Sequence, residues 1–357
     1  MMMRRFVNLV VDAAAGGGDT TAYNLYRVAA SALFSSPARR QAANVKGGQF
    51  TLYSNTDELV LNPDDVDDAG GLPPPAITFH PSSLAGPGNV YFLPLSGCAG
   101  SSDDDSLLAL DVDGRALLYG AASAALRNMP DPCKPKIAPI SFTAGDGRLY
   151  VIERVPFSGN PGCFEALTYG QLPDGDQRSL MGWYWRSLPP PPLAEVGYGD
   201  LFRRRDYDIT ASAVFDDTEL WVTAHGAGTF SFDTKGGDWM KLGEWHMPFK
   251  GRGEYVEEHD LWFGLSSSGT WRRTPGLHLC SCHLFGPSDE PVTTCLLDGL
   301  DRLPAAAPPK QSFLMEAYAV HLGSGKVCIA RFMEEKYGSR CGQNKNRCLL
   351  LTGVELS

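Results

Sequence analysis

A hairpin pattern that recurs along the chain limits the folds available to it. In each copy a strand of small or apolar residues is followed by a turn rich in Gly, Asp or Ser, and then by an apolar triplet. The clearest copy lies within Ile209–Phe249, where the pattern indicates four short antiparallel strands in a unit of about 40 residues. We expect these strands at Ile209–Phe215, Leu220–Ala224, Thr229–Phe232 and Asp238–Leu242.

Four other parts of the chain repeat this hairpin. They join Ile77–Phe79 to Val90–Phe92, Ile140–Phe142 to Leu149–Val151, Tyr255–Val256 to Leu261–Phe263, and Tyr318–Val320 to Val327–Ile329. A four-stranded sheet of this size cannot bury both of its faces alone, so the copies must stack on one another. The pattern therefore predicts an all-β protein, a β-propeller in which each copy is one blade.

Each end of the chain carries an incomplete copy. Phe6–Val11 and Tyr23–Val28 match the second and third strands of a blade without a first strand, and Cys348–Glu355 matches a third strand. A ring of sheets avoids free edges when its two ends share a blade. We therefore expect six four-stranded blades closed by pairing of N- and C-terminal strands, although the irregular spacing allows one blade more or fewer.

The whole chain is expected to be one domain, because a closed ring of repeats cannot be divided into separate domains. Within 1–357, the strand pattern lapses at 35–75 and 334–347, which we expect to be irregular or mobile loops. Pro189–Pro192 follow a tryptophan-rich strand and are interpreted as a link between blades, since proline ends strand pairing. The alternative is a polyproline ligand for an aromatic groove.

The charge of the chain argues against nucleic acid as a partner. The formal net charge is −10, from 41 acidic and 31 basic side chains. The basic cluster Arg203–Arg205 is followed at once by acids and reads as a solvated loop. Acidic runs within 64–68 and 103–105 lack the ligand spacing of a calcium loop and are also expected to be loops.

The lengths of the apolar runs and the spacing of the cysteines indicate the cellular compartment of the protein. No apolar run approaches the roughly 18 residues of a membrane span. The apolar run that begins at Phe6 favours a strand over a targeting peptide, since it is short and contains Asn8. Nine cysteines with no repeated spacing predict free thiols in a reducing compartment, the cytoplasm or the nucleus.

One strand carries a candidate metal site. Alternation places His278, Cys280 and Cys282 on the same face, and all three side chains are possible zinc ligands. Same-face neighbours in a strand lie roughly 6.5–7 Å apart, however, which is wider than the ~3.5–4 Å between sulfurs on one zinc ion. Because the sequence contains no matching Cys-x-x-Cys pair, we interpret the strand as ordinary packing and keep metal binding as the alternative.

No other pattern identifies a catalytic residue or a cofactor. His225-Gly-Ala-Gly228 lacks the lysine and helix of a phosphate loop and is expected to be a hairpin turn. His225, His246, His259 and His321 are too scattered to define a metal centre.

Several segments resemble a large, grass-expanded plant family, catalogued as domain of unknown function sixteen-sixty-eight, which is similar to kelch and F-box-associated propellers. The resemblance rests on Arg4–Val10, Trp183–Pro192, Gly226–Thr234, Pro248–Val256, Glu258–Gly264, Leu322–Phe332 and Leu351–Glu355. It implies a plant source and a kelch-like propeller, and it brings no activity or site residues. In the related F-box proteins a helical ubiquitin-ligase module precedes the propeller; because the first strand begins near Phe6, we expect that module to be absent.

The function we expect is a non-enzymatic scaffold or adaptor for protein interaction. Such a monomer would bind a protein partner through its loops, with no nucleic acid, membrane or cofactor involved. The alternative is an enzyme, or a small-molecule or glycan binder, that uses the central channel of the propeller.

Overall fold

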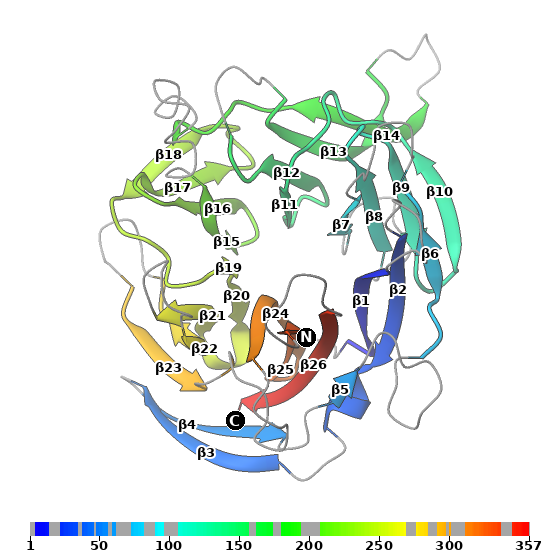
Figure 1. The fold of residues 1–357 in the computed structure, drawn as a ribbon. Helices are drawn as coiled ribbons and strands as arrows, with labels where there is room; N and C mark the ends of the chain where they lie inside the picture. Colours follow the sequence, from blue (N-terminus) through cyan, green and yellow to red (C-terminus); the bar gives the residue numbers. More distant parts are fainter. Residues whose placement is uncertain are drawn as a thin grey trace.

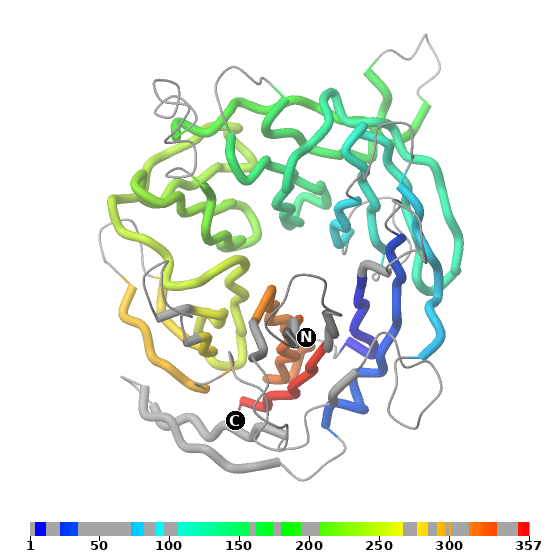
Figure 2. The backbone as a smooth tube through the Cα atoms, in the orientation of Figure 1, coloured from blue at the N-terminus to red at the C-terminus, as the bar shows by residue number. Residues whose placement is uncertain are grey.

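The structure of the protein, a computed structural model, is a closed ring of sheets, drawn as a ribbon in Figure 1 and as a tube in Figure 2. It describes residues 4–13, 22–34, 38–45, 48–55, 59–61, 73–81, 90–95, 106–156, 162–173, 180–193, 208–268, 276–284, 291–297, 300, 311–336 and 345–356.

The fourth blade follows the repeat pattern most closely. Its strands are β15 (Ile209–Phe215), β16 (Glu219–Ala224), β17 (Gly228–Asp233) and β18 (Trp239–Gly243). Asp216 and Asp217 turn the chain between β15 and β16 with φ values of 48° and 54°, a left-handed conformation that aspartate tolerates. All four predicted strands are confirmed to within a few residues.

The second, third and fifth blades are also four-stranded. The second contains β7 (Val90–Pro94), β8 (Ser106–Asp111), β9 (Ala116–Gly120) and β10 (Ala125–Met129). The third contains β11 (Pro139–Thr143), β12 (Leu149–Glu153), β13 (Phe164–Gln171) and β14 (Met181–Ser187). The fifth contains β20 (Glu254–Val256), β21 (Leu261–Ser268), β22 (Gly276–Cys282) and β23 (Thr293–Leu297), while β19 (Gly251–Arg252) pairs with β15 of the fourth blade.

The sixth blade joins the two ends of the chain. Its inner strands are β24 (Gln311–Gly323), β25 (Lys326–Lys336) and β26 (Lys345–Leu356). Its outer strands are β3 (Ala38–Val45), β4 (Gly48–Asn55) and β5 (Leu59–Leu61). β26 pairs with both β4 and β5, so the N-terminal part of the chain supplies the outer edge of the last blade. The predicted closure by pairing of N- and C-terminal strands is confirmed, and the C-terminal strand is the third of its blade, as predicted. Its N-terminal partners are β4 and β5, however, and not the strands at Phe6–Val11 and Tyr23–Val28 that the sequence suggested.

The first blade corrects part of the sequence interpretation. β1 (Phe6–Ala13), β2 (Ala22–Ala29) and β6 (Ile77–Phe79) form a separate three-stranded sheet, followed after β2 by the 3-10 helix η1 (Ala30–Phe34). The predicted hairpin between Ile77–Phe79 and Val90–Phe92 is therefore wrong, because β6 pairs with β2. The structure also places strands at 38–45, 48–55 and 59–61, and at 334–336 and 345–347, where irregular loops were expected; 62–72 and 337–344 lie outside the described residues.

The core lies between blades. Six clusters of buried side chains occur among the described residues, and each joins two neighbouring sheets around the ring. Successive residues of a strand point to opposite faces, so every blade contributes to two clusters. The last cluster packs Val7 and Leu9 of the first blade against Cys328 and Leu351 of the sixth, which closes the circle. The six sheets and their six interfaces confirm the predicted six-bladed propeller.

Antiparallel order gives the ring two different faces. The connections between blades lie on one face with the turns between second and third strands, and we call this the connection face. The turns between first and second strands lie on the opposite face. No helix in the described part of the chain has the length and hydropathy needed to cross a bilayer.

Candidate functional site

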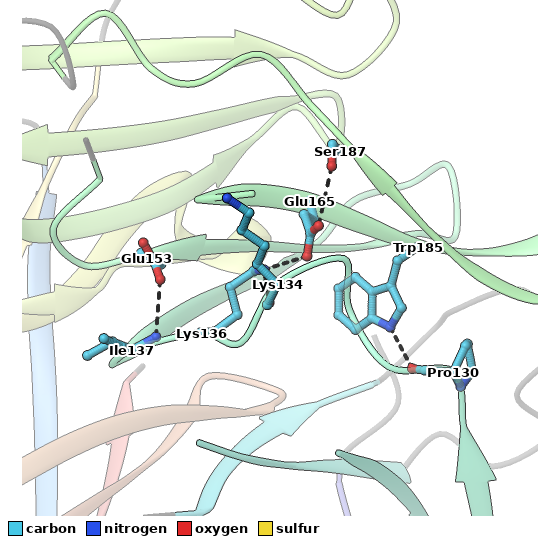
Figure 3. Close-up of polar contacts among 8 residues, drawn as sticks. All are labelled: Pro130, Lys134, Lys136, Ile137, Glu153, Glu165, Trp185 and Ser187. Carbon is cyan, nitrogen blue, oxygen red and sulfur yellow. Dashed lines mark hydrogen bonds and ion pairs between the residues drawn. The ribbon is translucent and has the colours of Figure 1, made fainter. Parts of the chain in front are cut away.

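A buried ion pair holds the connection between the second and third blades on the connection face (Figure 3). Lys136 in this connection donates to Glu165 of β13, and neither side chain is exposed (0% and 0%). The Lys136 ammonium also donates to the Lys134 carbonyl at 2.7 Å, and the Ser187 hydroxyl donates to Glu165 Oε1 at 3.3 Å. Both charges are therefore paired and hydrogen-bonded, as burial requires.

Further hydrogen bonds fix the same connection at both ends. The Trp185 indole N–H donates to the Pro130 carbonyl at 2.8 Å, and the Ile137 N–H donates to Glu153 Oε1 at 3.3 Å. Figure 3 shows these contacts on either side of the ion pair. The cluster thus attaches the connection to the third blade.

Cys133 is the group beside the ion pair that could carry chemistry. Its thiol is exposed, and partial desolvation together with a hydrogen bond to Glu165 raises its pKa. A thiol with a raised pKa remains protonated at neutral pH and is a poor nucleophile. With Glu165 already accepting from Lys136 and Ser187, the arrangement is suited to holding the connection.

The candidate metal strand is part of the core. Cys280 and Cys282 of β22 are buried in the cluster between the fourth and fifth blades, whereas Leu279 points toward the sixth, as alternation predicts. The Cys280 thiol donates to the Gly264 carbonyl at 3.4 Å. Burial raises the pKa of Cys280 to about 12 and also raises that of Cys282. No group of three possible metal ligands occurs among the described residues.

The structure brings together histidines that looked scattered in the sequence. The rings of His225 and His246 lie 6.4 Å apart on the connection face of the fourth blade. His321 of the sixth blade and His259 of the fifth lie close enough for His259 to contribute, after burial, to lowering the pKa of His321. Sequence reasoning missed both pairs, because their members are separated by 21 and 62 positions. The predicted turn at His225–Gly228 is confirmed between β16 and β17.

An apolar row runs out of the core along the hairpin of β13 and β14. Trp185 belongs to the core between the second and third blades, Trp183 is only partly packed there, and Met181 is 59% exposed. Tyr169 pairs directly with Trp183, and their ring centroids lie 5.3 Å apart. A hydrogen bond of 3.0 Å from the Leu172 N–H to the Leu180 carbonyl extends this hairpin, and Leu180 is 61% exposed. In Figure 1 the hairpin lies at the outer edge of the ring.

The proline run serves as the predicted link. Pro189–Pro192 follow β14, and the Trp239 indole N–H of the fourth blade donates to the Pro189 carbonyl at 2.9 Å. Leu188 and Leu193 at the two ends of the run are buried. The basic cluster Arg203–Arg205 and the acidic runs within 64–68 and 103–105 lie outside the described residues.

The sheets and their closure define the chain as a six-bladed β-propeller protein. Its sequence matches the model of one family over residues 4–357. The chain belongs to that family, described as "Protein of unknown function (DUF1668)". No curated protein matches the chain at a significant level.

The solved structures that match the chain share little sequence identity with it. The β-propeller domain of Cps50 (Swd1) from Myceliophteria thermophila has 10% identity and a TM-score of 0.29, with 79% of this chain and 80% of that chain covered. A protein of unknown function from Bacteroides thetaiotaomicron has 9% identity and a TM-score of 0.32, with 98% of both chains covered. The N-terminal domain of Nup159 has 10% identity and a TM-score of 0.31, with 97% and 86% covered. Scores this low carry no argument about function.

Proposed function

We propose that this protein is a non-enzymatic scaffold or adaptor that binds a protein partner at the end of the β13–β14 hairpin. The observation that carries the proposal is the apolar row of Trp185, Trp183 and Met181, which begins in the core and ends in solvent. Contiguous exposed apolar surface on a soluble protein is typical of interaction sites, and aromatic and methionine side chains are enriched there. The partner surface would present aliphatic or aromatic side chains to Met181 and the exposed side of Trp183.

The propeller suits this role because its core does not depend on the hairpin end. The buried clusters lie between blades, whereas the contact surface extends beyond them. The setting that we propose is the cytoplasm or nucleus. The free thiols of Cys133, Cys280, Cys282 and Cys328 support a reducing compartment.

A matched pair of substitutions tests the proposal. Met181→Asp places a charge in the apolar row, and Met240→Asp does the same on β18, where the methionine is 56% exposed against 59% for Met181. The full chain and both variants are used for quantitative affinity purification from cells of the source organism. We expect a partner that the wild type and Met240→Asp retain, and that Met181→Asp binds at least about tenfold more weakly, a loss of ~1.4 kcal/mol. Equal recovery of every bound protein by the wild type and Met181→Asp would contradict the proposal.

A further inference from the structure

The place where the ring closes is also a meeting point of three chain segments. At the turn between β24 and β25, the Arg4 N–H donates to the Leu322 carbonyl at 2.7 Å, and the Leu356 N–H donates to the Gly325 carbonyl at 2.8 Å. The 3-10 helix η4 (Glu257–His259) of the fifth blade lies against the same turn, since a Cβ added at Gly325 would lie 3.4 Å from His259 Nε2. The first described residues, the last ones and the fifth blade therefore all contact this turn.

A buried imidazole lies in this junction. His321 of β24 continues the row of Ala317 and Ala319, which packs toward the fifth blade, and it is only 6% exposed. Its Nε2 atom is buried and has no hydrogen-bond partner among the described residues. Its backbone N–H donates to Glu254 Oε2 of β20 at 2.7 Å, which ties the fifth blade to the sixth. The imidazole thus lies at the point where β24 contacts β20.

The charged groups around His321 oppose one another. Glu254 of β20 and Glu258 of η4 favour the imidazolium, whereas Arg4 and His259 disfavour it. Glu254 is already engaged by the His321 backbone and by Arg252, whose Nε lies 3.5 Å from Glu254 Oε1. Glu258 is exposed, so water screens its charge. Burial dominates and lowers the pKa of His321 from its ordinary value.

We propose that the junction of the fifth and sixth blades is an acid-sensitive switch, in which protonation of His321 weakens the packing of β24 against β20 and loosens the closure of the ring. A proton on the imidazole would add a charge to a buried ring whose Nε2 has no acceptor in the described part of the chain. The hydrogen bond from the His321 N–H to Glu254 and that from the Arg4 N–H to the Leu322 carbonyl, at the next residue of β24, join the fifth blade and the N-terminal segment to the sixth blade.

The direction of the pH effect follows from linkage. Because the pKa is lowered in the closed ring, the closed state binds fewer protons than an opened one, in which histidine has a pKa of about 6.5. The stabilisation from the neutral imidazole is fully present above about pH 6.5 and declines as the pH falls below it. We call the equilibrium constant between the opened and the closed junction the opening constant. If His321 stayed unprotonated in the closed state, its protonation in the opened state could raise this constant at most about eightfold between pH 7.0 and 5.5. Carboxylates with pKa values near 4 change little in this range.

Hydrogen exchange of the full chain at pH 7.0 and 5.5 tests the proposal, with exchange times corrected for the intrinsic rates. The opening constant is compared between peptides of the junction, within 254–265 and 314–329, and peptides within 219–233 of the fourth blade. His321→Gln removes the titrating group, and His225→Gln is the matched control, because His225 is exposed on the connection face. In the wild type and His225→Gln, we expect a several-fold rise confined to the junction. In His321→Gln, more than half of that rise should be lost.

Two results would overturn the proposal. One is a junction whose opening in the wild type is no more pH-dependent than that of the fourth blade; the other is a His321→Gln variant that keeps more than half of the rise. If His321→Gln does not fold, NMR titration of the wild-type imidazole decides. A His321 pKa below about 6.5 supports the switch, and a value at or above it refutes the switch.

Discussion

Removing one partner of the buried ion pair should destabilise the propeller strongly. Lys136→Met leaves the Glu165 carboxylate at a position with 0% exposure, where the remaining donors among the described residues are the Ser187 hydroxyl at 3.3 Å and the Cys133 thiol. Breaking a buried pair in this way costs about 3–5 kcal/mol. At roughly 2.1 cal/mol/K of unfolding entropy per residue, a chain of 357 residues would lose about 4–7 °C in Tm.

The assay is urea unfolding followed by tryptophan fluorescence and circular dichroism, with a double-mutant cycle. Glu165→Gln alone should also destabilise the protein, and Lys136→Met with Glu165→Gln should cost less than the sum of the two by at least ~1 kcal/mol. Lys241 and Glu244 provide the control, since their ion pair of 2.6 Å is exposed (41% and 83%), and Lys241→Met should cost less than ~1 kcal/mol. The reasoning is refuted if Lys136→Met costs no more than Lys241→Met.

Two further expectations concern the turns and the thiols. Gly228→Ala should destabilise the fourth blade by about 3 kcal/mol or more, because Gly228 has φ +90° and its Cβ would lie 2.2 Å from the Gly243 carbonyl oxygen. Gly237→Ala, with φ +79° and nothing within 4 Å, should cost only the backbone strain of ~1 kcal/mol, and equal urea midpoints for the two variants would disprove the clash. At pH 8 a thiol reagent should label the exposed Cys295 in the native protein and Cys133 more slowly, because the pKa of Cys133 is raised, but Cys280 and Cys328, whose pKa values burial raises to about 12, only after unfolding. Peptide mapping by mass spectrometry checks this, and rapid native labelling of Cys280 would count against it.

The local parts of the fold could be predicted from the sequence because the information is local. In the fourth blade the turns that join successive strands carry their own signals, such as Asp216-Asp217 and the glycine at 228. Period-two alternation within each strand then identifies the residues that face the neighbouring blades. The same logic located the strands that became β11, β20 and β24.

The choice of partner for a strand is not local, and here the sequence interpretation failed. Ile77–Phe79 reads as the first half of a hairpin, because an apolar triplet follows it at Val90–Phe92. In the structure Phe79 instead lies opposite Tyr23, more than fifty positions earlier. Between them the chain leaves the first blade to supply β4 and β5 to the sixth. The apolar triplet Ile77–Phe79 is equally compatible with pairing to β2 or to β7, so periodicity alone cannot decide between these two strands.

The sequence marks Glu165 and His321 as polar residues on buried strand faces, but it does not identify their partners. Alternation places Glu165 on the same face as Leu167, and His321 in line with Ala319, so a polar side chain on a buried face was visible in each strand. A buried polar group requires a partner or a pKa change, which makes such positions worth noting. Glu165 is satisfied by Lys136 from a connection 29 residues away, whereas His321 Nε2 finds no partner among the described residues. Only the ring geometry distinguishes these outcomes, because it decides which groups from neighbouring blades reach each face. The first group therefore becomes a fixed attachment, and the second becomes sensitive to pH.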